Sequence, residues 1–176
     1  MQIHFIDPAN VFSDGLKVIQ SYHDSLLEHG HRLLDLVNEI EQKGIDTERA
    51  NRLAELYAYY QRATTLHHQD EERVLFPSLV GRDILIDGMI ERLTLDHEEI
   101  EEAWRVLEIS LKEILEHHCL SDQLVERTAR FEKLQRLHLI RENEDFLPRM
   151  VKVLDEHQRQ EMGRKMAAMR RKSQRL

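Results

Sequence analysis

The chain is poor in the residues that break helices or form disulfide bonds. Its 176 residues include six glycines, three prolines and one cysteine, Cys119. A single cysteine excludes an internal disulfide framework and is typical of proteins from a reducing compartment. Few glycines and prolines, together with no sustained alternation of polar and apolar residues, indicate an all-α protein. The length is that of one domain with a substantial core.

Long apolar runs and targeting segments are also missing. No apolar run is long enough to span a bilayer. The first ten residues, MQIHFIDPAN, lack the basic and apolar regions of a secretory signal. We therefore expect a cytoplasmic protein that does not bind a membrane. The formal net charge of -8 also argues against general nucleic-acid binding.

Positive charge is concentrated at the C-terminus. From Arg159 onward the chain has seven Lys or Arg residues and one acid, Glu161, so this tail carries +6 and the remainder -14. Met162, Met166 and Met169 recur within the tail at helical spacing. We interpret the tail as an amphipathic helix whose methionines pack on the rest of the protein and whose charges face solvent. Contact with an anionic partner is the alternative.

Glycines and helix-capping residues divide the chain into four long helical segments. The segments cover, in order, about 13–44, 47–77, 89–118 and 121–148. Because the connections between them are short, we predict an up-down-up-down antiparallel four-helix bundle at 1–150. Residues 151–176 are predicted to form a short peripheral C-terminal helix that packs on the bundle or extends from it.

Each segment has an apolar stripe with alternating three- and four-residue steps, the pattern of helices packed in a bundle. Polar residues that can bind metals interrupt these stripes at six positions: His23, His67, Glu71, His97, His138 and Glu142. Burying a carboxylate without compensation is costly, so these glutamates need a partner. Residues four apart lie on one helical face, so each His-x-x-x-Glu unit presents a nitrogen and a carboxylate to one point. Two divalent cations with a bridging hydroxide would largely offset the carboxylate charge.

The two His-x-x-x-Glu units repeat with the same flanks. HHQDEERVLFP at 67–77 resembles HLIRENEDFLP at 138–148, and His, Glu and Pro each recur 71 positions later. Helix geometry places His68 about 100° from the stripe, so register and repeat both select His67. On the first helix, His29 is the alternative to His23. Carboxylates with terminal imidazoles are the ligands expected for two non-haem iron ions, with manganese or zinc as alternatives.

Other polar and aromatic residues have simpler interpretations. Four histidines are predicted at the surface or at helix ends: His31, His117, His118 and His157. Tyr60, one heptad before His67, either reaches the metals or packs in the core with its hydroxyl satisfied elsewhere. Polar residues on the stripes suggest a small hydrated pocket near the metals: Thr64, Thr128 and Gln135. Trp104 and Phe131 are assigned to the core.

These motifs resemble the hemerythrin-like, or HHE cation-binding, family. The similarity covers about residues 13–150 and rests on HHxxEExxLFP in the second segment and DHEEI in the third. It implies a four-helix bundle with an oxo- or hydroxo-bridged diiron centre. By this resemblance Glu71 and Glu142 bridge the ions, and the terminal ligands are His23, His67, His97 and His138. A ferritin-like bundle is disfavoured because its motif is Glu-x-x-His.

The chain departs from the oxygen-carrying hemerythrins of that family. They have a second histidine on the third helix, where this chain has Glu101, and His-x-x-x-x-Asp on the last helix, where it has His138 and Glu142. Glu101 either coordinates or, more simply, faces solvent. Six protein ligands instead of seven leave open positions, so we predict binding or sensing of a small ligand: dioxygen, nitric oxide or iron itself.

Two other functions are kept as alternatives to the binding or sensing of a small ligand. The first is a diiron enzyme that turns over peroxide or nitric oxide, or an iron-donating factor that repairs iron–sulfur centres. The related repair proteins carry an N-terminal segment with cysteines, which counts against repair here. The second is a structural bundle that uses no metal. The sequence identifies no protein partner and leaves open whether there is turnover.

Overall fold

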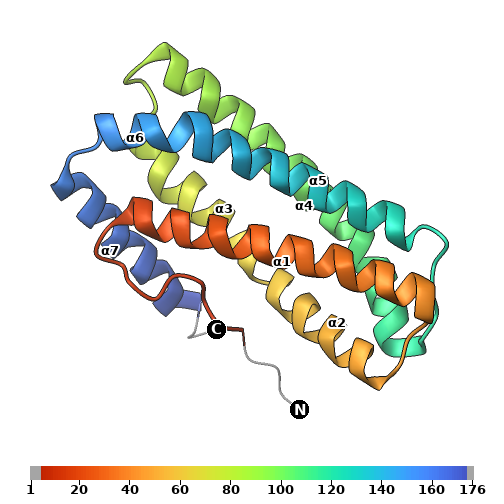
Figure 1. Cartoon of the computed structure of the whole chain (residues 1–176). Helices are drawn as coiled ribbons and strands as arrows, with labels where there is room; N and C mark the ends of the chain where they lie inside the picture. The colour runs from red at the N-terminus through yellow and green to blue at the C-terminus, as the bar shows by residue number, and fades with distance from the viewer. Residues whose placement is uncertain (1–4, 174–176) are drawn as a thin grey trace.

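The computed structural model describes residues 5–173, and the side chains of residues 5–171. Within this range the chain is helical and contains no β-strand, so the prediction of an all-α protein is confirmed. Figure 1 shows long helices packed side by side as a bundle, with the C-terminal helix beside the start of the first. The most extensive contacts between helices join α5 to α4 and to α1.

The first long helix, α1 (Gly15–Lys43), begins and ends where predicted. The Asp14 carboxylate accepts a hydrogen bond from the Leu16 N–H at 2.9 Å, which satisfies one of the free donors of the first turn. The helix ends at Gly44, whose φ of 77° lies in the left-handed region that glycine adopts without strain. Its buried face includes His23.

The predicted second helix, from Asp46 to about Pro77, is wrong as one regular element. The structure divides it into α2 (Thr47–Tyr60), α3 (Ala63–Asp70), a π-helical turn η1 (Glu71–Leu75) and a 3-10 turn η2 (Phe76–Ser78). In η1 the Phe76 N–H bonds to the Glu71 carbonyl five residues back. Pro77 has no N–H to continue an α-helical ladder, which accounts for the end of the element here.

The third and fourth helices begin at other residues than predicted. Helix α4 (Ile84–His117) starts before Met89 because the Asp83 carboxylate accepts the Leu85 N–H at 2.7 Å and caps it. Helix α5 (Leu124–Arg141) starts after Gln123, whose N–H donates to Ser121 Oγ at 3.2 Å. It continues into a second π-helical turn, η3 (Glu142–Phe146), and then into α6 (Leu147–Val153).

The C-terminal helix α7 (Glu156–Ser173) packs on α1 and on η1. Met162 and Met166 are buried and Met169 is partly buried against the core, so the predicted packing of the methionines is confirmed. The prediction that the basic residues face solvent is wrong for Arg170, whose side chain is only 11% exposed because it binds the buried Asp70. The side chains of residues 172–176 in this tail lie outside the described part.

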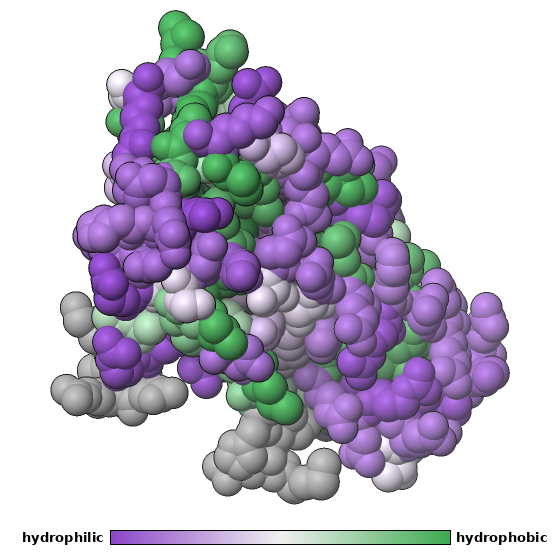
Figure 2. All heavy atoms as spheres, turned by 60° about the vertical axis from the view of Figure 1, so that its left-hand side comes forward, coloured by the Kyte–Doolittle hydropathy of each residue, from purple (hydrophilic) through white to green (hydrophobic). Residues whose placement is uncertain are grey.

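Hydrophilic side chains cover most of the face drawn in Figure 2, and hydrophobic ones form smaller separate patches. The four histidines predicted at the surface or at helix ends are exposed: His31, His117, His118 and His157. None of the helices in residues 5–173 is long and apolar enough to cross a membrane.

Candidate metal centre

The six residues that interrupt the helical stripes meet inside the bundle. None of them has more than 1% of its surface exposed. Their positions on the elements are α1 for His23, α3 for His67, η1 for Glu71, α4 for His97, α5 for His138 and η3 for Glu142. Each His-x-x-x-Glu unit thus ends with its glutamate as the first residue of a π-helical turn. Such turns widen the helix and frequently occur at functional sites.

The two carboxylates lie between imidazole rings from different helices. Glu142 Oε2 is 3.0 Å from His23 Nε2 and 3.2 Å from His138 Nε2. Glu71 Oε2 is 3.1 Å from His97 Nε2, and Glu71 Oε1 is 3.8 Å from His67 Nε2. Glu71 and Glu142 therefore each face rings on both sides.

Two groups of potential ligands share both carboxylates. One group is His23, His67, Glu71 and Glu142, and the other is Glu71, His97, His138 and Glu142. Within each group the ligand atoms all lie within 4.8 Å of one another. Each group could hold a metal ion.

The atoms that face this centre are not satisfied by hydrogen bonds. Both carboxylate oxygens of Glu71 and Glu142 are buried without a hydrogen-bond partner, and so are four ring nitrogens, the Nε2 atoms of His23, His67, His97 and His138. Buried polar groups normally have partners because leaving them unpaired is costly. Converging lone pairs of this kind fit metal ions, which would satisfy all of them together.

Two of the four rings are oriented by a hydrogen bond at the other nitrogen. These bonds join His23 Nδ1 to Asn143 Oδ1 (2.7 Å) and His97 Nδ1 to Glu72 Oε1 (2.7 Å), while His138 Nδ1 lies 3.5 Å from Asp96 Oδ2 without a hydrogen bond. An oxygen that accepts the Nδ1 proton leaves a lone pair on Nε2, the usual arrangement of a histidine that binds a metal. The two rings are thus held ready for coordination.

These orienting residues were missed by the sequence analysis, although the repeat contains a sign of them. Glu72 and Asn143 occupy the same place in the two repeated units, directly after Glu71 and Glu142. Asp96 precedes His97 and also pairs with Arg92 and Arg141.

His67 is held by ring packing. The Tyr22 ring lies parallel to it, with 5.8 Å between centroids. The Tyr22 hydroxyl donates to Asp7 Oδ1 at 2.7 Å and accepts from Arg170 Nη2 at 3.2 Å. Burial raises the pKa of Tyr22 well above its usual range, so the hydroxyl keeps its proton. Tyr22 was not predicted at the site.

The polar residues predicted to form a hydrated pocket near the metals, Thr64, Thr128 and Gln135, bind other protein groups. The Tyr60 hydroxyl donates to Gln135 Oε1 at 3.3 Å, and Gln135 Nε2 is 3.3 Å from Thr64 Oγ1. Tyr60 therefore follows the core alternative, with its hydroxyl satisfied away from the two ligand groups. Thr128 Oγ1 donates to the Leu124 carbonyl of its own helix.

Two histidines were weighed as competitors of the proposed ligands. His29, the alternative to His23, lies apart from the ligand groups: its Nδ1 donates to the Ser25 carbonyl at 2.8 Å and its ring stacks on Tyr59. His68 was placed off the stripe by helix geometry, but it is 3% exposed and stacks on His97. Both His67 and His68 lie in the regular helix α3, so His68 does point about 100° away from His67, and it is buried because its ring stacks on His97 of α4.

Protons compensate the charge of the cluster in the metal-free chain. Burial lowers the pKa of His23, but Glu142 and Glu71 outweigh burial and raise it to about 10. Burial is likewise outweighed at His97, where Glu71 and Glu72 raise the pKa to about 10. Burial raises the pKa of Glu142, yet His138 and His23 bring it well below its usual range. Cations that bind these rings must therefore displace protons.

Comparison with known proteins identifies a family for most of the chain. The model of the family described as Hemerythrin HHE cation binding domain matches residues 14–150. That range contains all six residues of the candidate metal centre. An uncharacterized protein of Haemophilus influenzae is 26% identical over 129 residues, which are 72% of this chain and 75% of that protein. No solved structure matches the chain.

Proposed function

Because the chain belongs to the hemerythrin HHE cation-binding family, we propose that it holds two non-haem iron ions in the interior of its helical bundle. His23 and His67 would hold one ion, His97 and His138 the other, and Glu71 and Glu142 would bridge them. The supporting observation is that two groups of unsatisfied, converging ligand atoms share both carboxylates. The proposal includes an up-down-up-down order of the four helical columns α1, α2–α3, α4 and α5.

The donor set favours iron without excluding related metals. Imidazole nitrogens suit iron and zinc, and carboxylate oxygens suit manganese and iron. A mixed set in which two carboxylates bridge is therefore best matched by iron, with manganese or zinc as outcomes that metal analysis distinguishes. The single cysteine, Cys119, fits a reducing cytoplasm.

The function that we infer for this centre is binding or sensing of a small ligand, either dioxygen or nitric oxide. Iron with an open coordination position supplies the affinity for such molecules. The protein residues contribute the rest: Asn143 and Glu72 orient two of the rings, and Asp96 lies beside a third. The fully buried Glu71 and Glu142 offset the cation charge.

Anaerobic reconstitution with iron(II) tests the proposal. After removal of unbound metal, we expect two irons per chain by metal analysis, followed by a change in visible absorption on exposure to nitric oxide or dioxygen. The variant His29→Ala should still bind two irons, because His29 lies outside both ligand groups. Wild-type protein that retains no more iron than an unrelated helical protein would exclude the proposed function.

The metal-free and metal-loaded proteins should respond differently to pH. The pKa values of His23 and His97 are raised to about 10 in the metal-free chain. The stability that these protonated rings contribute is fully present below an unfolded-state pKa of about 6.5 and is lost as pH rises through the folded-state values. We therefore expect the thermal unfolding midpoint of chelator-treated protein to fall as the pH is raised from about 6.5 to 8.5.

Metal-loaded protein should not show this fall, because its bound rings carry no proton at Nε2 and protons compete less as pH rises. Both forms are to be compared by calorimetry in the same buffers. Parallel pH profiles of the two forms would contradict a role of these rings as ligands.

A further inference from the structure

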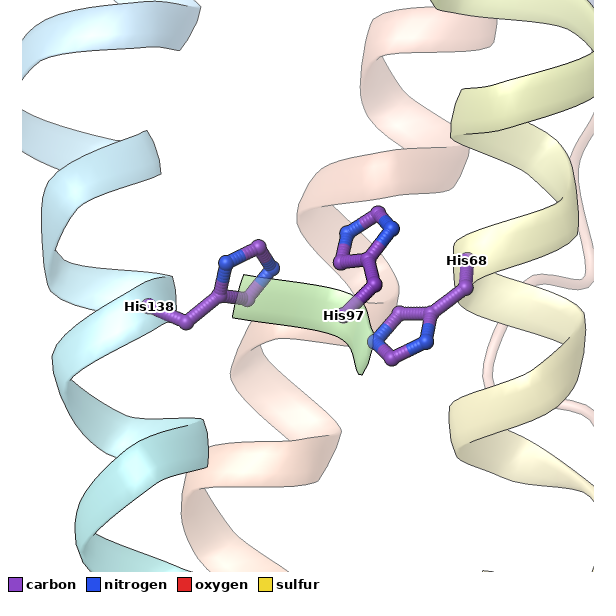
Figure 3. A group of neighbouring side chains, drawn as sticks. All are labelled: His68, His97 and His138. Atoms are coloured by element: carbon purple, nitrogen blue, oxygen red, sulfur yellow. The ribbon is translucent and has the colours of Figure 1, made fainter. Parts of the chain in front are cut away.

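His68 belongs to neither of the two ligand groups that share the carboxylates, yet it lies against His97, which belongs to one of them. The two rings stack face to face, with 3.8 Å between centroids and 10° between planes. His68 also meets the His138 ring at 78°, with 6.0 Å between centroids. Figure 3 shows that these three rings come from three different helices, α3, α4 and α5. His68 therefore lies beside both imidazoles that we propose for one of the ions.

A face-to-face stack restricts the plane of the His97 ring and leaves both of its nitrogens free for other partners. The Nδ1 atom is 2.7 Å from Glu72 Oε1, and the Nε2 atom is 3.1 Å from Glu71 Oε2. Phe76 adds a second ring nearly parallel to His97, with 5.9 Å between centroids and 14° between planes. One segment of the chain, from α3 to η2, thus orients the His97 ring, although His97 itself lies on α4.

The His68 ring is itself anchored to α4. Its Nδ1 is 3.1 Å from Glu101 Oε1, and Glu101 lies four residues after His97 on the same face of that helix. The His68 side chain is 3% exposed and that of Glu101 is 51% exposed, so this contact ties a buried ring to a carboxylate at the surface. Because His68 is held at its edge by Glu101 and covered on one face by His97, neither ring can turn without displacing the other.

The first repeated unit follows each proposed ligand with a residue that contacts His97. His68 directly follows His67 and stacks on the His97 ring. Glu72 directly follows Glu71 and bonds to the Nδ1 atom of the same ring. In each pair of identical neighbours, the first residue is a proposed ligand and the second supports a ligand from another helix.

The second unit keeps the hydrogen-bonding partner and not the stacked rings. Asn143, which follows Glu142, contacts the Nδ1 atom of His23. Leucines take the places of the two rings that lie parallel to His97: Leu139 and Leu147. The stack on His97 is therefore a feature that the repeat does not require, and an aliphatic side chain is accommodated at the equivalent place.

We propose that His68 is a positioning residue for the ion held by His97 and His138: its ring, anchored by Glu101, fixes the plane of His97 so that Nε2 faces the ion. This role rests on the two-ion centre proposed above and leaves the number of protein ligands at six. Glu101 then acts through His68, and neither as a direct ligand nor as a simple solvated residue.

Two substitutions of His68 separate stacking from coordination and from packing. His68→Phe keeps a planar ring without a nitrogen, and His68→Leu introduces the residue of the second unit. In a titration with cobalt(II), a paramagnetic substitute for iron(II), we expect His68→Phe to bind both ions about as tightly as the wild type. His68→Leu should bind one ion about 10-fold more weakly or worse. Equal loss in both variants overturns the proposal in favour of coordination, and wild-type affinity in both overturns it in favour of packing alone.

Nuclear magnetic resonance of the cobalt-loaded protein gives a second readout, which a purely structural residue would not change. Each coordinated ring that keeps its Nδ1 proton gives one strongly shifted resonance that disappears in heavy water. We expect no more than four in the wild type and the same number in His68→Phe, with one displaced because a different ring then covers His97. A fifth resonance in the wild type, or an unchanged spectrum in His68→Phe, overturns the proposal even if His68→Leu does not fold.

His29→Leu is the matched control, because His29 is also a stacked imidazole but lies outside the ligand groups. Its ring lies on Tyr59 with 3.6 Å between centroids and 9° between planes. This variant should change neither the cobalt affinities nor the shifted resonances. Wild-type protein that binds fewer than two cobalt ions overturns the proposed function itself, whereas the other contrary outcomes overturn only the role of His68.

Discussion

Replacing both Glu71 and Glu142 by glutamine is expected to abolish the binding of both metal ions at once. Each carboxylate belongs to both ligand groups, and each is fully buried. Glutamine keeps the size of the side chain but removes the negative charge that faces the cations. Loss of an orienting partner alone costs about 10–100-fold in affinity, so loss of both bridging charges should cost more than about 100-fold. Anaerobic titration with iron(II) measures the effect.

The same variant separates a metal centre from a structural bundle. Each ion at a free concentration of about 100 times its Kd stabilises the folded wild type by about 2.7 kcal/mol. Added metal should therefore raise the thermal midpoint of the wild type and leave the variant unchanged. Without metal the variant should unfold at a similar or higher temperature, because two buried charges are gone and the rings become neutral.

A matched control keeps the charge change but places it at the surface. Glu98 and Glu144 are exposed, so Glu98→Gln with Glu144→Gln loses the same two charges away from the centre. This control should bind two ions and respond to metal as the wild type does. If the Glu71 and Glu142 variant also bound two ions, a different set of residues would have to hold them.

Much of the candidate centre could be predicted from sequence because it lies on the buried stripes of helices. A buried stripe has a helical period, so a histidine or glutamate on it stands out against leucine and isoleucine. The repeat of the two His-x-x-x-Glu units gave a second, independent reason to select His67 and not its neighbour His68. His23 and His97 followed from the same periodicity on the remaining two helices.

Prediction from the apolar stripes failed where the helix departs from a regular period. The break after Tyr60 and the π-helical turns at Glu71 and Glu142 change the angle between successive residues. The prediction for His68 failed for a different reason: it lies in the regular part of α3 and does turn away from the stripe, but the face to which it turns packs on His97 of α4. No local pattern marks a π-helical turn in advance, because it depends on what the widened turn contacts in the folded protein.

Tyr22, Asp7 and Arg170 could not be predicted for another reason. Arg170 contacts Asp7 and Asp70 across more than half of the chain length, through the docking of α7. Sequence spacing relates residues within one element and carries no information about such contacts. An arginine in a basic tail is usually solvated, and here the buried Asp70 changes that outcome.

Arg170→Met is expected to produce a large loss of stability in this protein. Arg170 binds the fully buried Asp70 carboxylate through two nitrogens, at 2.5 and 2.7 Å, and its Nε donates to Asp7 at 2.9 Å. Removing one partner of a buried ion pair costs about 3–5 kcal/mol because the other charge stays buried. For a chain of this length, that corresponds to a fall of roughly 6–20 °C in the thermal midpoint.

The loss should depend on the Asp70 carboxylate. Burial already raises the pKa of Asp70 and Arg170 opposes that rise, so in Arg170→Met the carboxyl group takes up a proton more readily. The destabilisation should therefore shrink at low pH. Adding Asp70→Asn to Arg170→Met should recover much of the lost stability, since no charge then stays buried. Arg171→Met, at the exposed neighbouring position, should change little.

The effect of Arg170 should also reach the metal centre. Arg170 donates to the Tyr22 hydroxyl, and the Tyr22 ring packs on His67. Since His67 belongs to only one of the two ligand groups, loss of Arg170 loosens a support of the ion held by His23 and His67 alone. We expect that ion to bind about 10-fold more weakly or worse in Arg170→Met, while the ion at His97 and His138 keeps its affinity. Equal weakening of both ions, or of neither, would indicate that α7 only stabilises the fold, whereas a selective loss makes it part of the support for one metal position.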